Sequence, residues 1–504
     1  MSTPVDRRGP VRVLMVVAIV AVSGLSVVAV RQVVTDTSSE RAVAWFAPYI
    51  DTTLTPLHAF EDPEVTAAGS IALGFVVARP GTDSASCTPT WGGAYDLDEA
   101  ATAIDLDRRI ARYRGRGGNV VVSFGGAANE ELAVACRDGD ALAQAYRDVI
   151  ERYDSTTIDL DIEGAALADH ASIVRRSRAI ARVQRDLASR GDHLSVWLTL
   201  PVAPGGLLAD AVAVVDATLA AGVDLGGVNV MTMDYGGGRE PSLPMGEAVL
   251  RSLSGTHRQL ADAYRRAGST LDSTEVWGRL GATPMIGVND TLTDVFTRAD
   301  GKALVDFARD RGLGRLSMWS ANRDAPCPGG PDPNRVSNTC SGLAQAPLDF
   351  SRILDRVSGR ALATGTGSTT KPDPASVDDP DTSPYPVWSP EGVFEAGDRV
   401  VRQRRVYVAK WWTQGDDPVA PVANLHDSPW RLVGPVLASD RPPSTTTLPA
   451  GTYPAWDATV AYRAGDRVLR AGVAYEAAWF ALGIDPASTP TADGPSPWRP
   501  LAKG

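Results

Sequence analysis

The stretch TTIDLDIEG, residues 156–164, alternates apolar with acidic side chains. Asp159, Asp161 and Glu163 stand two residues apart, so a strand would place their carboxyl groups on one face, each about 6.6 Å from the next. Burying carboxyl groups close together is costly, and neighbouring carboxylates resist joint ionisation. The pattern therefore predicts acid–base chemistry. Glu163 would carry a raised pKa and donate a proton at neutral pH, while the inner pair share one proton.

The elements that must position these acids alternate along residues 42–360. Longer amphipathic stretches separate short β-rich runs, which are 43–48, 71–77, 119–125, 157–163, 194–200, 227–233, 283–288 and 314–319. Eight strands alternating with helices predict an α/β fold, a (β/α)8 TIM barrel, with a doubly wound open sheet as the alternative. Barrel strands have no free edge, which argues against a solvated acidic face at the edge of a sheet. Barrel enzymes also place their chemistry where strands end, as Glu163 does here.

Two related units follow the predicted barrel. Segments 361–384 and 436–452 are rich in Gly, Ser, Thr and Pro, which predicts linkers. The units themselves, 385–435 and 453–502, repeat each other with a constant offset, and both contain AGDRV and SPWR. Units of this size predict two small all-β domains without large cores.

Adjacent aromatic residues stand at matching places in the two units. Trp411 and Trp412 correspond to Trp479 and Phe480. Neighbours on a strand cannot both face inward, so at least one ring should be exposed and form a binding surface. Flat rings suit the apolar faces of sugars, although a stacked pair of core aromatics is the alternative.

The N-terminus predicts export. A basic segment, 1–12, precedes the uncharged apolar run 13–30, which is at the lower length limit for a helix that spans a bilayer. The basic flank would keep the N-terminus in the cytoplasm and send the rest of the chain across. A cleaved signal peptide is the alternative, and both interpretations place the body outside the cytoplasm.

The four cysteines agree with export. Cys327 and Cys340 bracket one Pro/Gly/Asn-rich loop and are expected to pair, which leaves Cys87 with Cys136. Free buried thiols are the alternative. The histidines are scattered and no Cys/His spacing suits zinc, so neither a metal nor another cofactor is expected. A formal net charge of −11 argues against general affinity for nucleic acid, and a monomer is expected.

TTIDLDIEG resembles the signature of glycoside hydrolase family 18, Asp-x-x-Asp-x-Asp-x-Glu on the fourth barrel strand. The last three acids match, whereas Thr156 stands where family members usually hold an outer supporting Asp. Three further stretches resemble family motifs in the expected order: SFGG at 123–126, MTMDY at 231–235 and SMWS at 317–320.

The resemblance implies a chitinase that needs no cofactor and retains configuration through an oxazolinium intermediate. Glu163 would protonate the glycosidic oxygen and later act as base, and Asp161 would hold the acetamide N–H of the substrate. Tyr235 would hold the acetamide carbonyl oxygen, and Asp159 would tune Asp161. The remaining substrate-binding residues implied are Ser123, Gly125, Met233, Asp234 and Trp319. The short segment 289–313 cannot contain the extra α+β domain of deep-cleft members, which predicts an open groove and endo-type cutting.

The C-terminal repeats resemble chitin-binding modules of carbohydrate-binding families 5 and 12, most closely through AKWWTQG at 409–415. The second repeat lacks the polar Thr-Gln pair, so its preference could differ. Chitin or a related N-acetylglucosamine polymer is the implied partner. The alternatives are a non-catalytic chitin-binding lectin, which the presence of Glu163 disfavours, and an endo-β-N-acetylglucosaminidase that acts on another glycan.

Overall fold

The computed structural model describes residues 44–358 and 378–501, apart from 67, 82–86, 381, 423–426, 443–447, 478–479 and 488–496. The predicted N-terminal segment 13–30 and most of the first predicted linker lie outside these ranges. No helix within the described ranges combines the length and the apolar character needed to cross a bilayer.

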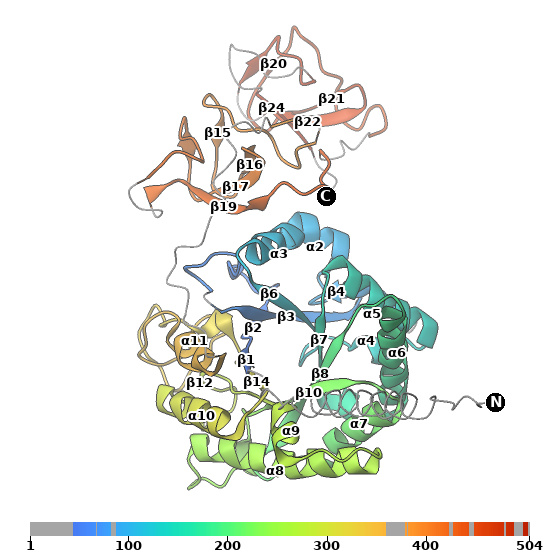
Figure 1. The fold of residues 1–504 in the computed structure, drawn as a ribbon. Helices are drawn as coiled ribbons and strands as arrows, with labels where there is room; N and C mark the ends of the chain where they lie inside the picture. The colour runs from blue at the N-terminus through green and yellow to red at the C-terminus, as the bar shows by residue number, and fades with distance from the viewer. Residues whose placement is uncertain are drawn as a thin grey trace, which may run out of the picture.

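A ring of parallel strands forms the centre of the larger domain (Figure 1). Its first position is divided between β1 (Trp45–Phe46), which pairs with β14 (Arg315–Leu316), and β2 (Tyr49–Asp51), which pairs with β3 (Ser70–Ala78). Parallel pairing continues around the ring through β6 (Asn119–Gly125), β7 (Thr157–Asp161), β8 (Ser195–Ala203), β10 (Leu225–Met231) and β11 (Leu280–Thr283). The predicted TIM-barrel-like α/β fold is confirmed.

Helices surround the barrel because each presents an apolar stripe to the strands (Figure 1). Helix α5, for example, buries Leu142, Tyr146 and Val149, and Asp138 caps its N-terminus. The helices are α2 (Leu97–Ala103), α3 (Leu106–Gly115), α4 (Leu132–Ala135), α5 (Gly139–Arg152), α6 (His170–Ser189), α7 (Ala209–Ala220), α8 (Met245–Arg266), α9 (Ser273–Gly278), α10 (Arg298–Arg311) and α11 (Asp349–Leu354). Short strands β4 (Pro89–Trp91), β5 (Tyr95–Asp96) and β9 (Gly206–Leu207) extend the barrel sheet.

The seventh barrel strand lies earlier in the chain than predicted. The prediction of a strand at 283–288 is confirmed only in part, because β11 ends at Thr283 and parallel pairing continues beyond it through one bridge between Met285 and Trp319. A Cβ on Gly281 would lie 3.0 Å from the Arg315 Cβ, so only a small residue fits at this position. Because small residues replace large apolar ones here, the sequence of the strand lacks a strong apolar signal. The later residues form β12 (Gly287–Val288), which pairs antiparallel with β13 (Val295–Phe296) outside the ring. Helix α10 fills most of the remaining segment before β14.

The C-terminal units form two small β domains built alike. The first contains β15 (Val393–Phe394), β16 (Arg399–Arg402), β17 (Arg405–Ala409), β18 (Thr413–Gln414) and β19 (Trp430–Pro435). The second contains β20 (Ala461–Tyr462), β21 (Arg467–Arg470), β22 (Val473–Ala477), β23 (Ala481–Leu482) and β24 (Trp498–Pro500). In each unit one tryptophan ring donates to a backbone carbonyl at 2.8 Å: Trp430 to Asp416, and Trp498 to Ile484. The repeat seen in the sequence is therefore a repeat in structure.

Both predicted disulfides are confirmed. Cys87 bonds to Cys136 and Cys327 to Cys340, with Cα atoms 4.6 and 5.1 Å apart. All four cysteines of the chain are thus paired, and the alternative of free thiols is wrong.

Candidate active site

The three acids lie on one face at the C-terminal end of β7. The strand ends at Asp161, but Glu163 keeps an extended backbone, with φ of −131° and ψ of 169°. The Ile162 amide continues the pairing by donating to the Thr199 carbonyl at 3.0 Å. Asp159 and Asp161 are buried and Glu163 is half-buried, so the row runs from the barrel interior toward its open end.

Asp159, the deepest acid, is surrounded by donors. Tyr49 and Ser123 donate to its Oδ2 atom at 2.8 and 2.6 Å. Thr199 and Arg315 donate to its Oδ1 atom, both at 2.7 Å. Four donors, one of them a guanidinium, thus occupy both oxygen atoms of the Asp159 side chain.

Asp161 differs sharply from Asp159. Burial raises its pKa well above the ordinary value, and the charges of Glu163 and Asp159 add to the rise, opposed only by Arg315. Its buried Oδ1 atom has no hydrogen-bond partner within the described residues. Burial therefore favours the neutral form of Asp161, and the sharing of one proton by the inner pair stays a prediction.

Glu163 has the properties of a general acid. Burial, followed by the negative charge of Asp234, raises its pKa to about 7. A carboxyl group with that pKa is protonated in a large fraction of molecules at neutral pH and can donate its proton.

Asp234 is held in place beside Glu163 by the segment that joins β12 and β13. Its backbone is left-handed, with φ of 47°. The Thr291 amide donates to its Oδ1 atom at 2.7 Å, and its own amide donates to Asn289 at 3.3 Å. Asp234 thus acts on Glu163 through its charge.

Tyr235 does not reach the acids, which corrects the role inferred from the family motif. Its hydroxyl lies 3.0 Å from that of Ser252 on α8, and its ring belongs to the core between barrel and helices. The charged groups acting on it are Asp294 and Arg239. Met233, two residues earlier, is buried. This placement does not support a contact between Tyr235 and substrate.

The motif on β6 supports the acids from beneath. Ser123 is fully buried and donates to Asp159, so its side chain is not accessible to a substrate. The family resemblance had implied that Ser123 binds substrate. Gly125 has φ of +99°, and a Cβ there would lie 2.0 Å from the Asp161 carbonyl oxygen. Only glycine allows β6 to approach the acid strand this closely.

Trp319 follows β14 and presents a half-buried ring. It stacks on Phe75 with ring centroids 5.6 Å apart and lies 6.2 Å from Tyr49, the residue that donates to Asp159. A flat ring beside the acid row provides the kind of floor on which a sugar can stack.

Sequence reasoning missed the residues that support Asp159 from other strands. Tyr49, Thr199 and Arg315 come from β2, β8 and β14, and Asn229 on β10 links Thr199 to Thr283 with bonds of 3.0 and 2.7 Å. No spacing connects residues so far apart in the chain. The one available signal was an arginine in a stretch otherwise typical of a buried strand.

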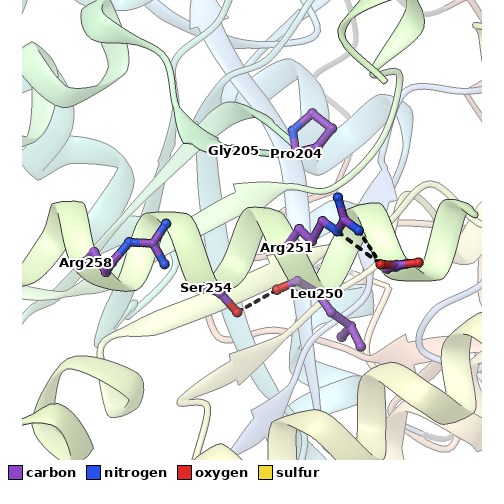
Figure 2. A pocket seen from close by; sticks show the side chains of 7 residues that line it. Pro204, Gly205, Leu250, Arg251, Ser254 and Arg258 are labelled. Carbon is purple, nitrogen blue, oxygen red and sulfur yellow. Dashed lines mark hydrogen bonds and ion pairs between the residues drawn. The ribbon is translucent and has the colours of Figure 1, made fainter. Parts of the chain in front are cut away.

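One cavity lies away from this chemistry (Figure 2). It has a volume of about 370 Å³ and lies between the turn after β8 and the exposed face of α8. Arg251 in its wall already pairs with Glu247 on the same helix. None of the acids lines it, so we assign it no catalytic role.

The paired aromatics of the first β domain are exposed. Trp411 and Trp412 expose 45% and 55% of their surface between β17 and β18, and Lys410 lies over the Trp411 ring. Phe480 of the second domain is 61% exposed, while Trp479 lies outside the described residues. Both Trp411 and Trp412 are therefore available to a ligand.

A barrel with an acid row at its open end and a protonated glutamic acid outermost defines the catalytic domain of a glycoside hydrolase. No family model matches the chain. It is 36% identical over 293 residues to the probable bifunctional chitinase/lysozyme of Escherichia coli, and 34% identical over 293 residues to endochitinase 11 of Metarhizium anisopliae. Each match spans 56% of this chain, but only 31% and 52% of those proteins.

Solved structures agree. The crystal structure of active domain 2 of the chitinase from Pyrococcus furiosus is 30% identical, with a TM-score of 0.53, and the match covers 63% of this chain and 95% of that domain. A second structure of that domain holds chito-oligosaccharides. The catalytic domain of this chain belongs to the family 18 type of chitinase.

Proposed function

We propose that this chain is a chitinase that hydrolyses β-1,4 linkages between N-acetylglucosamine units. The observation that carries the proposal is a pair of neighbouring acids: Glu163, with a pKa of about 7, and the buried Asp161 beneath it, whose pKa is raised by burial and whose Oδ1 atom has no partner among the described residues. A proton donor and a polar group that lacks a partner are what a substrate with an acetamide group requires.

The reaction follows from these groups. Glu163 donates its proton to the glycosidic oxygen, and the bond from that oxygen to the anomeric carbon breaks. The acetamide carbonyl oxygen of the substrate attacks the same carbon and gives an oxazolinium ion, so no enzyme carboxylate serves as nucleophile. The free Oδ1 atom of Asp161 accepts the acetamide N–H. Glu163, now ionised, removes a proton from water as the water oxygen bonds to the anomeric carbon. The bond from that carbon to the acetamide oxygen breaks, so the oxazolinium ring opens and the configuration is retained.

The same scheme gives each neighbour a role. Arg315 and the hydroxyl groups around Asp159 hold that carboxyl group in place beneath Asp161. The sugar stacks on Trp319. Because α10 fills the segment before β14 and leaves no room for an inserted domain, we also propose an open groove and internal cutting.

Hydrolysis of a chitin hexamer tests the proposal. We expect products of intermediate length before the disaccharide accumulates, and the β-anomer at each newly formed reducing end. A hexamer of glucose is the matched control, and it should remain intact because it has no acetamide group to act as nucleophile. Disaccharide alone from the first minutes would exclude internal cutting. Cleavage of both hexamers at similar rates would exclude substrate assistance.

We further propose that the first β domain binds chitin through Trp411 and Trp412. Replacing both with alanine should weaken retention on insoluble chitin about tenfold or more, because two stacking surfaces are lost. Turnover of soluble oligomers should not change. Leu208→Ala, at an exposed apolar position of the barrel domain, is the control for loss of an exposed apolar side chain. Equal retention of the double variant and the unaltered chain would remove this role from the first domain.

The two disulfides support a place outside the cytoplasm, where such bonds persist. We propose accordingly that the catalytic and β domains act on extracellular polymer.

A further inference from the structure

The first β domain does not hang from the barrel on a flexible tether. Strand β19 lies along helix α3 of the barrel (Figure 1). A Cβ on Gly434 of β19 would lie 2.6 Å from the Arg108 carbonyl oxygen, so the backbone of the strand touches that of the helix. The cavity left between the two surfaces has a volume of only about 40 Å³. Contact this close requires specific bonds, and the interface contains several.

The carboxylate of Asp105, at the start of α3, forms hydrogen bonds with the first β domain. An aspartate in this position ordinarily caps its own helix, but the Asp105 side chain makes no capping bond. Its carboxylate instead accepts from the Tyr385 hydroxyl at 2.7 Å and from Arg399 at 2.5 Å, both in the β domain. Only 2% of Asp105 is exposed. Besides a longer contact of 3.4 Å with Arg108 of its own helix, the carboxylate therefore bonds mainly to the β domain.

Glu61 makes a second buried connection. It lies in the segment between β2 and β3 and is fully buried. Arg109 of the barrel and Arg431 of β19 each donate to one of its oxygen atoms, at 2.9 and 2.8 Å. These charges hold the pKa of Glu61 below its usual value although burial alone would raise it. Glu61 thus needs a cation from each domain.

Barrel arginines complete the interface from the other side. Arg108 donates to the Pro435 carbonyl and makes a bidentate ion pair with Asp440 at 2.8 and 3.1 Å. Arg112 donates to the Leu432 carbonyl. Asp440 belongs to the segment predicted as the second linker, so part of that segment is anchored to the barrel.

The second β domain contains an arginine equivalent to Arg399, and that arginine forms its ion pair within its own domain. Arg399 and Arg467 occupy the same place in the repeat, and each faces a residue on the neighbouring strand: Val408 in the first domain and Glu476 in the second. Arg467 pairs with Glu476 at 2.8 Å inside its own domain. Val408 leaves Arg399 without such a partner and lines the interface cavity, and Arg399 reaches Asp105 instead.

We infer that the first β domain is a fixed part of the catalytic unit, anchored to the barrel by the buried carboxylates of Asp105 and Glu61. The Trp411–Trp412 surface then lies at a constant position relative to Glu163, and a polymer held there meets the acid row in one orientation. Docking itself is independent of the reaction catalysed. Its benefit on a solid polymer rests on the function proposed above.

Amide hydrogen exchange on the full chain tests docking. In the variant R399A/R431A, segment 54–62 and the first turns of α3 should exchange at least about tenfold faster, because truncating one partner of buried charge pairs weakens an interface by that much or more. R467A, which removes the equivalent arginine of the second domain, should leave these segments unchanged. D105N should have the same effect as the double variant while preserving the side-chain size.

Fast exchange of these segments already in the unaltered chain would overturn the inference, as would equal effects of R467A and R399A/R431A. Activity separates this outcome from failure of the proposed function. With docking lost, hydrolysis of insoluble chitin should fall severalfold while cleavage of a soluble hexamer and retention on chitin persist. A chain that cleaves no chitin but shows the expected exchange would refute the function and keep the docking. Unchanged hydrolysis of the solid polymer would refute the benefit assigned to it.

Discussion

Replacing Glu163 with glutamine should slow hydrolysis of a chitin hexamer by a factor of about 10² to 10⁴, the usual contribution of a positioned general acid. Glutamine has nearly the same shape but cannot release a proton to the glycosidic oxygen, so kcat should fall while KM changes little. Single-turnover and steady-state rates on purified protein measure the effect.

The pH profile provides the internal control. Glu163 donates only while protonated, and its pKa is raised to about 7 by burial and by Asp234. The rate of the unaltered enzyme should therefore decline as the pH rises through about 7, whereas the residual rate of the Glu163→Gln variant should not show this decline. Glu240→Gln, at an exposed position, is the matched substitution and should leave the rate unchanged. A glutamine variant with near-normal activity would contradict the assignment of the proton donor.

The acid row could be predicted because it depends on local geometry alone. An extended strand alternates its faces, and Asp159, Asp161 and Glu163 obey that alternation even beyond the end of β7. The substrate contact of Tyr235, in contrast, was implied by the family motif and not by this alternation. Asp234 adopts a left-handed backbone, which breaks the extended path, and Tyr235 then points to α8 rather than to the acids. The φ angle of Asp234, which composition does not reveal, decides whether Asp234 or Tyr235 faces the site.

Docking of the first β domain could not be predicted for a different reason. Composition correctly marks segments that lack a core of their own, but it does not show what their few charged residues bind. Asp105, Arg399 and Asp440 are unremarkable surface types in sequence, and only the fold brings them together. Comparison of the two repeats comes closest to a sequence signal for docking. Arg467 faces its ion-pair partner Glu476, whereas the equivalent Arg399 faces Val408.

Replacing Arg315 with methionine should lower the free energy of unfolding by about 3–5 kcal/mol, the usual cost of removing one partner from a buried ion pair. Neither Arg315 nor Asp159 is exposed, and they are joined at 2.7 Å. Arg315 also donates to Tyr49 and Ser317 and lies between the rings of Trp45 and Trp197, 4.9 and 5.6 Å from their centroids. Methionine fills the space but leaves Asp159 with a buried, uncompensated charge. Chemical denaturation measures the loss.

A double-mutant cycle separates charge from packing. If Arg315 acts mainly by compensating Asp159, then Arg315→Met combined with Asp159→Asn should be much more stable than the sum of the single losses predicts, because the buried charge is gone. Arg265→Met removes an exposed ion pair with Asp262 and should cost no more than about 1 kcal/mol. Strict additivity of the two core substitutions would show that Arg315 stabilises the barrel only by packing between the tryptophan rings.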